Sequence, residues 1–382
     1  MAVPTTCRLL VEPSLKRARS EAENPNAMPS PFSSLALPSS LALLVVLGCI
    51  VAAFVLVRAQ DRRQRRHARR CARNLTRLLS RYLEDQASLA ELRRAVRAAG
   101  AGPFWTALET FSLRLGRREW LRLSRALERN HHSIEERRAL ADDSPWRRSL
   151  AARRLALLRS RASWRALRRA LTRGPEMVTL AAANALARYR DHGALRWLLA
   201  HPGALGRRTP QSLVALLRAF GPRALPELAL ALERGLDATR VERAVIDTLG
   251  LGRYRAARAV LERCLRSDQL DLRVAAARAL GRLEAVESGT LLLVALKDEA
   301  WQVRAHAARA LGQVQAPIAI PALAKCLTDR AWWVRRHAAY ALVELGEDGR
   351  RALREVSEAS PDPYARDMAR EALDGGPRLR IA

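Results

Sequence analysis

The chain has 382 residues, of which 49% are hydrophobic and 27% charged, and its formal net charge is +29. This length and apolar content allow a substantial buried core, which excludes a wholly disordered protein. The five cysteines are scattered without C-x-x-C pairs, which argues against a zinc site or a disulfide framework and suits a reducing compartment. No phosphate-binding loop, nucleophile elbow or dinucleotide glycine fingerprint is present, so no common enzyme class is indicated.

The positive charge is concentrated in one part of the chain. Residues 58–173 contain 31 arginines against 11 acidic residues, whereas residues 174–382 have a surplus of only eight basic side chains. Such a surplus favours acidic partners, including nucleic acid and anionic lipid. The bias toward arginine over lysine also fits a GC-rich genome, so arginine content alone identifies no ligand.

The first 57 residues predict a tail followed by a membrane-spanning helix. Residues 1–37 are polar, contain proline and serine and have no helical period, so we expect them to be disordered, with Met28 as an alternative start. Leu41–Val57 then gives 17 consecutive residues without a polar side chain. A run of that length is enough for a membrane span, so residues 38–57 are expected to form one transmembrane helix.

A cluster of arginines follows the apolar run and defines a basic juxtamembrane segment over residues 58–73. By the positive-inside rule this flank stays in the cytoplasm, which predicts an external N-terminus, a cytoplasmic repeat domain and attraction to anionic lipid headgroups. The cluster at the membrane surface is made up of Arg58, Arg62, Arg63, Arg65, Arg66, Arg69 and Arg70.

Two other interpretations of the apolar run stay open. A cleaved signal peptide carries its positive charge ahead of the run, but here the arginines lie behind it. Val46–Cys49 has the form of a lipoprotein cleavage box, with Cys49 as the lipidated residue, yet the run remains apolar for eight residues beyond Cys49. The length and the flanking charge favour an uncleaved span.

Residues 74–133 predict a helical cap or diverged first repeat. The expected helices cover residues 75–83, 89–99, 104–115 and 120–129, with breaks at residues 100–103 and near Gly116. Terminal repeats of a solenoid are commonly atypical because they cover an apolar face. His131 and His132 fall in the following loop, without cysteine or carboxylate at metal-ligand spacing.

Residues 134–382 contain a repeat of about 31 residues with the pattern V-R-x-x-A-A-x-A-L-G. It is clearest at Val303–Gly312, and related segments at Leu272–Gly281 and Val334–Val343 lie 31 residues to either side. The small and apolar positions fall at helical spacing, so each copy predicts a helix with one buried stripe. Eight copies can be aligned, starting at Arg147, Val178, Ser212, Val241, Leu272, Val303, Val334 and Ala365.

Each repeat also predicts a second helix and two turns. Leucines 20 and 24 residues after the repeat start, such as Leu292 and Leu296, place one buried face on the second helix. Glycine after the first helix is expected to be a left-handed C-cap, and aspartate before the next first helix an N-cap. These residues are Gly221, Gly250, Gly281 and Gly312, and Asp268, Asp298 and Asp329.

The repeat resembles the HEAT-repeat family, and specifically its short variant, the phycobilisome-lyase-type HEAT-like repeat. The resemblance covers residues 134–382, and tetratricopeptide and ankyrin signatures are absent. It implies an all-α fold, a right-handed α-solenoid of HEAT-like helical hairpins, here preceded by the one transmembrane helix. Family members are mostly protein-interaction solenoids and a minority are enzymes, so the resemblance alone fixes no chemistry. We expect a binding protein without enzymatic activity or cofactor.

Histidines and arginines recur in the repeats. Some HEAT-family hydroxylases bind metal through His-Glu pairs, but alanine follows both His306 and His337, so we expect no metal site. Arg273, Arg304, Arg335 and Arg366 form a ladder that could follow phosphates. The aspartates recur in step with them, which favours pairing of each arginine with the aspartate of its own or the next repeat.

Tryptophans recur as well. Trp301 and Trp332 stand two residues before the repeat start in consecutive copies, a position occupied by Leu270 in the preceding copy. Apolar residues at one repeat position usually pack between repeats, so we expect these in the core. Trp333 has no counterpart and is expected to be exposed as a partner-binding residue.

The second helices are expected to line the concave face and to carry the partner-binding surface. Leu293, Val294, Ile318 and Ala324 are left over after the buried leucines are assigned, which predicts an exposed apolar patch. Tight curvature that buries them is the alternative. The equivalent helix of the first clear repeat holds Arg165, Arg168 and Arg169, so the face is expected to change from basic to apolar toward the C-terminus.

The sequence therefore predicts a membrane-anchored HEAT-repeat scaffold that mediates protein–protein interaction at the cytoplasmic face of the membrane. The expected partner is a protein, and another membrane protein is one of the candidates. The first alternative is a nucleic-acid-binding HEAT protein resembling the repeat-built DNA glycosylases, which the charge supports and the membrane span opposes. The second alternative, a bilin-lyase-like enzyme, is supported by fold analogy alone.

Overall fold

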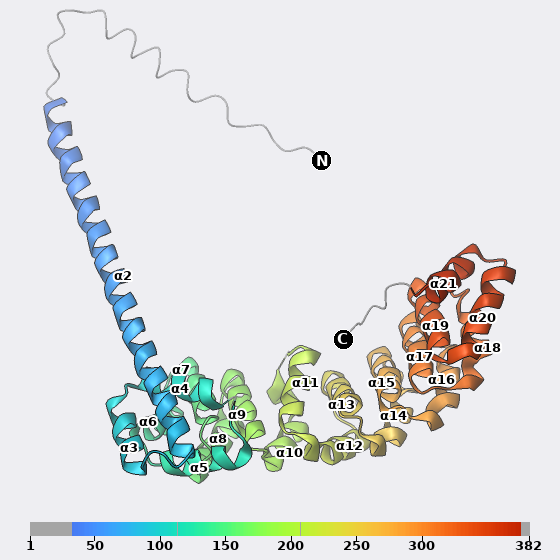
Figure 1. The fold of residues 1–382 in the computed structure, drawn as a ribbon, viewed down its shortest axis with the longest axis horizontal. Coiled ribbons are helices and arrows are strands. Elements are labelled where there is room, and N and C mark those ends of the chain that lie inside the picture. Colours follow the sequence, from blue (N-terminus) through green and yellow to red (C-terminus); the bar gives the residue numbers. More distant parts are fainter. Residues whose placement is uncertain (1–32, 113, 207, 376–382) are drawn as a thin grey trace, which may run out of the picture. The chain divides into compact units, whose positions relative to one another are not determined.

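The computed structural model describes residues 33–112, 114–206 and 208–375 of the chain, and helices are the only regular elements there (Figure 1). It divides into two compact units, residues 1–71 and residues 72–382. The all-α solenoid expected from the repeat period is confirmed. The predicted N-terminal tail lies, as far as residue 32, outside the described residues.

Helix α2 (Ser33–Leu83) contains both the apolar run and the arginine cluster. No helix in the described part of the chain is long and apolar enough to cross a membrane. The predicted transmembrane helix over residues 38–57, and with it the single-pass membrane location, is therefore wrong.

The arginine cluster of residues 58–70 lies on the exposed surface of α2. Arg65 pairs with Asp61 one helical turn earlier, with Nη2 2.7 Å from the Asp61 Oδ2. Arg58 lies over the Phe54 ring, with Cζ 4.9 Å from the ring centroid. These are local contacts within one helix, and the predicted contact of the cluster with anionic lipid is not supported.

The second unit begins with a group of helices, called the cap below for its place at the start of the unit, that has its own core. The end of α2 packs with α3 (Leu89–Ala98), α4 (Ala101–Ser112) and α5 (Arg117–Leu127), and the buried side chains include Leu79, Leu92, Phe104, Trp105 and Leu127. Leu157 and Leu158, which follow α7, complete this core and so join the cap to the first repeat.

One helix of this region was not predicted. His131 and His132, expected in a loop, form the first turn of α6 (His131–Ala139), whose N-cap Asn130 accepts the Ser133 N–H at 3.0 Å. His132 is buried, and its Nε2 donates to the Ala99 carbonyl at 2.9 Å. It therefore serves the packing of α6 on the cap.

The eight predicted first helices are all present. They are α7 (Pro145–Leu155), α9 (Glu176–Arg188), α11 (Pro210–Ala219), α13 (Thr239–Leu251), α15 (Leu270–Leu283), α17 (Trp301–Gln313), α19 (Trp332–Glu344) and α21 (Pro363–Leu373). From α11 to α19, Figure 1 shows consecutive first helices side by side in one layer, and each packs on the next.

The second helices form the other layer, and three of them, α14, α16 and α18, are only 7 residues long. They are α8 (Arg161–Arg173), α10 (His192–Ala200), α12 (Leu225–Arg234), α14 (Arg258–Cys264), α16 (Gly289–Ala295), α18 (Ile320–Cys326) and α20 (Gly346–Ala359). Short 3-10 turns precede four of them: η2 (Pro222–Ala224), η3 (Arg255–Ala257), η4 (Val286–Ser288) and η5 (Pro317–Ala319). The extra residues between Val178 and Ser212 include a further turn, η1 (Pro202–Leu205).

Residues 317–327 illustrate why one predicted helix becomes a turn and a helix. Pro321 has no N–H to donate to the Pro317 carbonyl, so an α-helix cannot run through from Pro317. The chain instead forms η5 and restarts at Ile320. The predicted leucine pair survives this change, because Leu323 and Leu327 are both buried.

The glycines after the repeat motif do not cap helices in the way the sequence indicated. Of the four, only Gly221 takes a left-handed conformation, with φ +83°. Gly250, Gly281 and Gly312 lie inside α13, α15 and α17, where each faces an alanine of the next first helix. A Cβ added at Gly281 would lie 2.9 Å from the Ala310 Cα. These glycines therefore allow close approach of neighbouring helices.

Candidate functional site

The turns that lead into α17 and α19 are built on aspartates. The Asp298 Oδ1 accepts the Ala300 N–H at 2.9 Å, and the Asp329 Oδ1 accepts the Ala331 N–H at 2.8 Å. Ala300 and Ala331 are themselves the N-caps of the helices. The aspartates are therefore not the helix N-caps that were predicted. Each accepts the N–H of the N-cap residue and so fixes the turn before the helix.

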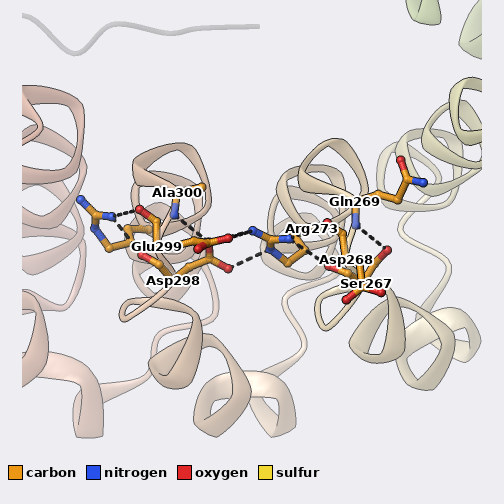
Figure 2. Close-up of polar contacts among 8 residues, drawn as sticks. Ser267, Asp268, Gln269, Arg273, Asp298, Glu299 and Ala300 are labelled. Carbon is orange, nitrogen blue, oxygen red and sulfur yellow. Dashed lines mark hydrogen bonds and ion pairs between the residues drawn. The ribbon is translucent and has the colours of Figure 1, made fainter.

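The recurring arginines link these turns from one repeat to the next. Arg273 donates Nε and Nη2 to Asp298 at 2.9 and 3.1 Å, and its Nη1 donates to the Ser267 and Asp268 carbonyls at 3.0 and 3.2 Å (Figure 2). Each arginine therefore holds the turn before its own helix and, through the carboxylate, the turn of the following repeat. Two partners were predicted for each arginine, the aspartate of its own repeat and that of the next repeat. Arg273 pairs with the aspartate of the next repeat.

Electrostatics reinforce the ladder. The hydrogen bonds from Arg273 to Asp298 raise the pKa of the Arg273 guanidinium. Those from Arg304 to Asp329 raise the pKa of Arg304 in the same way. Burial alone would raise the pKa of Asp329, but the Arg304 hydrogen bonds and the Ala331 N–H outweigh it and hold that pKa below its ordinary value. Bidentate, partly buried pairs of this kind are among the stronger ionic contacts in proteins.

The ladder stops at Arg335, which has no aspartate ahead of it. Ser360 stands at the position that Asp298 and Asp329 occupy in the earlier repeats. Arg335 still donates Nη1 to the Asp329 carbonyl at 2.9 Å, but its buried Nε has no hydrogen-bond partner among the described residues. Its Cζ lies 5.4 Å from the centroid of the Tyr364 ring.

An exposed apolar row runs across the same ends of the first helices. Leu270, Trp301 and Trp332 are the first residues of α15, α17 and α19, and their exposed fractions are 38%, 40% and 42%. The prediction that the tryptophans are buried between repeats is wrong. The tight contact between first helices is filled by small side chains such as Ala307 and Ala338, which leaves no room for an indole.

Trp333 and Tyr364 extend this row toward the C-terminus. Trp333 is 37% exposed and packs edge-on against Trp332, with ring centroids 4.7 Å apart. Tyr364 is 67% exposed and occupies the position of α21 that Trp333 occupies in α19, so the prediction that Trp333 has no counterpart is wrong. We call Leu270, Trp301, Trp332, Trp333 and Tyr364 the aromatic row. The predicted binding residue Trp333 thus lies in a larger surface than the sequence suggested.

The row is held by contacts behind it. The Arg336 Cζ lies 5.1 Å from the centroid of the Trp332 ring, while Arg336 Nη1 donates to the Glu371 Oε1 of α21 at 2.6 Å. The His337 ring lies against Trp333, with centroids 6.1 Å apart. Trp332 and Trp333 are therefore each held by a contact with another side chain.

The predicted apolar patch on the second helices is only partly exposed. Val294 on α16 and Ile318 in η5 have exposed fractions of 65% and 73%. Leu293 and Ala324 are half-buried, and Leu293 packs against the main core. Binding of a partner by this patch stays a prediction.

The predicted basic residues of α8 separate into two groups. Arg165 and Arg169 line a cleft of about 580 Å³. Arg168 instead faces Asp191, with Nη1 3.4 Å from the Oδ1, and lies over Trp164. All three were expected on one face of α8. Arg168 differs from the other two because its side chain contacts Asp191 of the next repeat.

The two repeat histidines lie together but bind no carboxylate. The rings of His306 and His337 have centroids 6.0 Å apart, and the His337 Nδ1 lies 2.9 Å from the Ala305 carbonyl. Burial, followed by the charge of Arg278, lowers the pKa of His306 to about 4. Within the described residues, no group of three or more histidine, cysteine, aspartate or glutamate side chains could hold a metal ion.

Comparisons with known families identify the repeats. The model of HEAT repeats matches residues 289–374, and the model of the PBS lyase HEAT-like repeat matches residues 272–298. Together the two matches cover residues 272–374. They support the predicted resemblance to the HEAT-repeat family and to its short phycobilisome-lyase-type variant. The search of curated proteins returned no match.

Several solved structures are similar to this chain. Importin beta is 15% identical with a TM-score of 0.46, and the match covers 80% of this chain and 47% of importin beta. The complex of CpcE and CpcF of phycocyanin lyase from Nostoc sp. PCC7120 is 20% identical with a TM-score of 0.29, covering 64% and 94%. Human deoxyhypusine hydroxylase is 18% identical with a TM-score of 0.27, covering 81% and 97%.

Proposed function

We propose that this protein is a HEAT-repeat scaffold that binds another protein through the aromatic row. The observation that carries the proposal is the exposure of Leu270, Trp301 and Trp332 at equivalent positions of three consecutive repeats. Large aromatic side chains held rigid at a surface are typical of the residues that dominate protein–protein binding energy. The proposal assigns the protein no reaction.

The arginine ladder supports this function by fixing the position of the row. Trp301 directly follows Ala300, whose N–H is bound by Asp298, and Trp332 follows Ala331 in the same way. A surface that is already ordered loses little conformational entropy when a partner binds. The ladder therefore acts as the support of the binding surface and not as a binding site itself.

The proposal is tested by comparing two double variants of the full chain in its native cells. Trp301→Ser with Trp332→Ser removes the aromatic row, and Val294→Ser with Ile318→Ser removes the exposed part of the second-helix patch. Proteins captured by crosslinking are identified by mass spectrometry, and each candidate is then purified and its affinity measured directly.

The expected result is a partner that binds the wild type and the Val294/Ile318 variant equally and the tryptophan variant about 100-fold more weakly, as for loss of two binding hot spots. Circular dichroism checks that both variants keep the wild-type helical content. The reverse pattern assigns binding to the second-helix patch, and equal capture by all three chains contradicts both surfaces.

A further inference from the structure

A cleft of about 580 Å³ lies on the second-helix side of the first repeat, between α6 and α8. Six arginines line it, and no acidic residue is among the lining residues. They are Arg137, Arg138, Arg148, Arg165, Arg169 and Arg173. We call this the basic cleft.

The spacing along α8 produces one wall and the floor. Arg165, Arg169 and Arg173 are four residues apart and form one stripe of the helix. Ala162, Ala166 and Ala170 form the adjacent stripe, and all six residues line the cleft. The helix therefore presents a row of cations beside a smooth apolar surface.

The opposite wall comes from α6 and the turn after it. Ile134 and Leu140 add apolar surface, and Arg137 and Arg138 add charge. Arg137 donates to the Glu128 carbonyl at 3.5 Å, and Arg148 donates to the Leu140 carbonyl at 3.1 Å, so these two arginines are tied to the backbone. Burial lowers the pKa of the Arg137 guanidinium.

The remaining arginines are not neutralised by the protein. The side chains of Arg138, Arg165, Arg169 and Arg173 make no ion pair or hydrogen bond among the described residues, in contrast to the paired arginines of the ladder. Like charges four residues apart on a helix repel each other and destabilise the helix. An anion in the cleft would remove this repulsion.

We propose that the basic cleft is a second binding site, which takes an acidic peptide segment of a partner protein whose apolar side chains pack on the alanine floor. Carboxylates complement the arginines, and the floor gives an apolar side chain of the segment a place to bury. The residues that line the cleft include no aromatic side chain on which an unpaired base could stack, which favours a peptide over single-stranded nucleic acid.

The test uses the full chain and a fluorescein-labelled ten-residue peptide of alternating glutamate and leucine, with binding followed by fluorescence anisotropy. The test variant is Arg165→Glu with Arg169→Glu. The matched control is Arg62→Glu with Arg66→Glu, an exposed pair on α2 with the same four-residue spacing and the same change in charge. A peptide with serine in place of leucine measures the part played by the floor.

We expect about tenfold or greater loss of affinity for the test variant and less than about twofold for the control, because only contacts at the site are removed. The serine peptide should bind several-fold more weakly than the leucine peptide. Equal losses for both variants would show general attraction to a basic protein and would overturn the proposal. Tighter binding of a labelled single-stranded oligonucleotide, lost in the same variant, would assign the cleft to nucleic acid instead.

Discussion

Arg304 binds the turns of two consecutive repeats at once. Its Nε and Nη2 donate to Asp329 at 2.7 and 2.8 Å, and its Nη1 donates to the Asp298 and Glu299 carbonyls at 2.9 Å each. The same side chain therefore joins the start of α17 to the start of α19. A solenoid is stabilised by contacts between neighbouring repeats, so a bond of this kind adds directly to its cooperativity.

Ser360→Asp should extend the ladder by one step and stabilise the protein. Arg335 and Ser360 are separated by the same 25 residues as Arg304 and Asp329, and the Ser360 Oγ already accepts the Asp362 N–H at 3.3 Å, as the aspartates accept theirs. A carboxylate here would pair with the free Arg335 Nε. We expect a gain of about 0.5–2 kcal/mol in the free energy of unfolding, measured by guanidinium chloride denaturation.

The control for this prediction is the same substitution in an Arg335→Gln background. There the new carboxylate has no guanidinium to bind, and the gain should disappear. A gain of equal size in both backgrounds would mean that the new carboxylate acts on the α21 N-terminus and not through the ladder.

Gly281→Ala should destabilise the protein although alanine is the better helix former. The added Cβ would lie 2.9 Å from the Cα and Cβ of Ala310 on the next first helix. Separating two packed helices costs more than the roughly 1 kcal/mol gained in helix propensity, so we expect a net loss of about 1–3 kcal/mol. Thermal and denaturant unfolding measure the change.

Gly102→Ala is the matched control. Gly102 lies in α4, and no heavy atom lies within 4 Å of an added Cβ. This variant should be neutral or up to about 1 kcal/mol more stable. If both alanine variants gain stability, close approach of α15 and α17 does not depend on Gly281.

The first helices were predictable because their signal is local. Val303, Ala307 and Leu311 fall four residues apart, and that spacing alone places them on one face of a helix, where all three are buried. The prediction that the glycines are C-caps fails for the same reason. A C-cap is a property of one helix, whereas the contact of Gly281 with Ala310 depends on how two repeats approach each other.

The aromatic row and the basic cleft depend on contacts between residues that lie still farther apart in the sequence. Trp301 and Trp332 recur at one position, and recurrence cannot distinguish a core position from an exposed row. The sequence predicts a loop at His131 and His132, and that prediction leaves no helix to form the α6 wall of the basic cleft. Asn130 as an N-cap, followed by a run without glycine or proline as far as Leu140, was the signal that could have found this helix.

Cys264 and Cys326 should react slowly with alkylating reagents at neutral pH. Burial raises the pKa of both thiols to about 11, so the reactive thiolate is scarce. We expect alkylation by iodoacetamide at pH 7.5 to be about 30-fold slower than for an ordinary exposed thiol, with the exposed Cys49 as the internal comparison. Peptide mass spectrometry measures each site. In guanidinium chloride the difference should vanish; a difference that persists there would show that sequence neighbours, and not burial, control the rates.

His306→Ala should flatten the dependence of stability on pH between about 4 and 6.5. Burial and the nearby Arg278 lower the pKa of His306 to about 4 in the folded chain, whereas an unfolded histidine titrates near 6.5. The unfolded state therefore binds the additional proton in this interval, and stability falls as the pH falls. The equivalent residue of the preceding repeat is Ala275, which is fully buried, so alanine fits this position.

The measurement is the free energy of unfolding at pH 7 and pH 4.5 for the wild type, His306→Ala and the exposed-site control His67→Ala. The wild type and the control should lose about 2 kcal/mol more than His306→Ala between the two pH values. Part of the loss remains in the variant, because burial also lowers the pKa of His337 and protonation weakens carboxylate pairs such as Arg304–Asp329. Equal losses in all three proteins would mean that His306 gains a proton in the folded repeat as readily as in the unfolded chain.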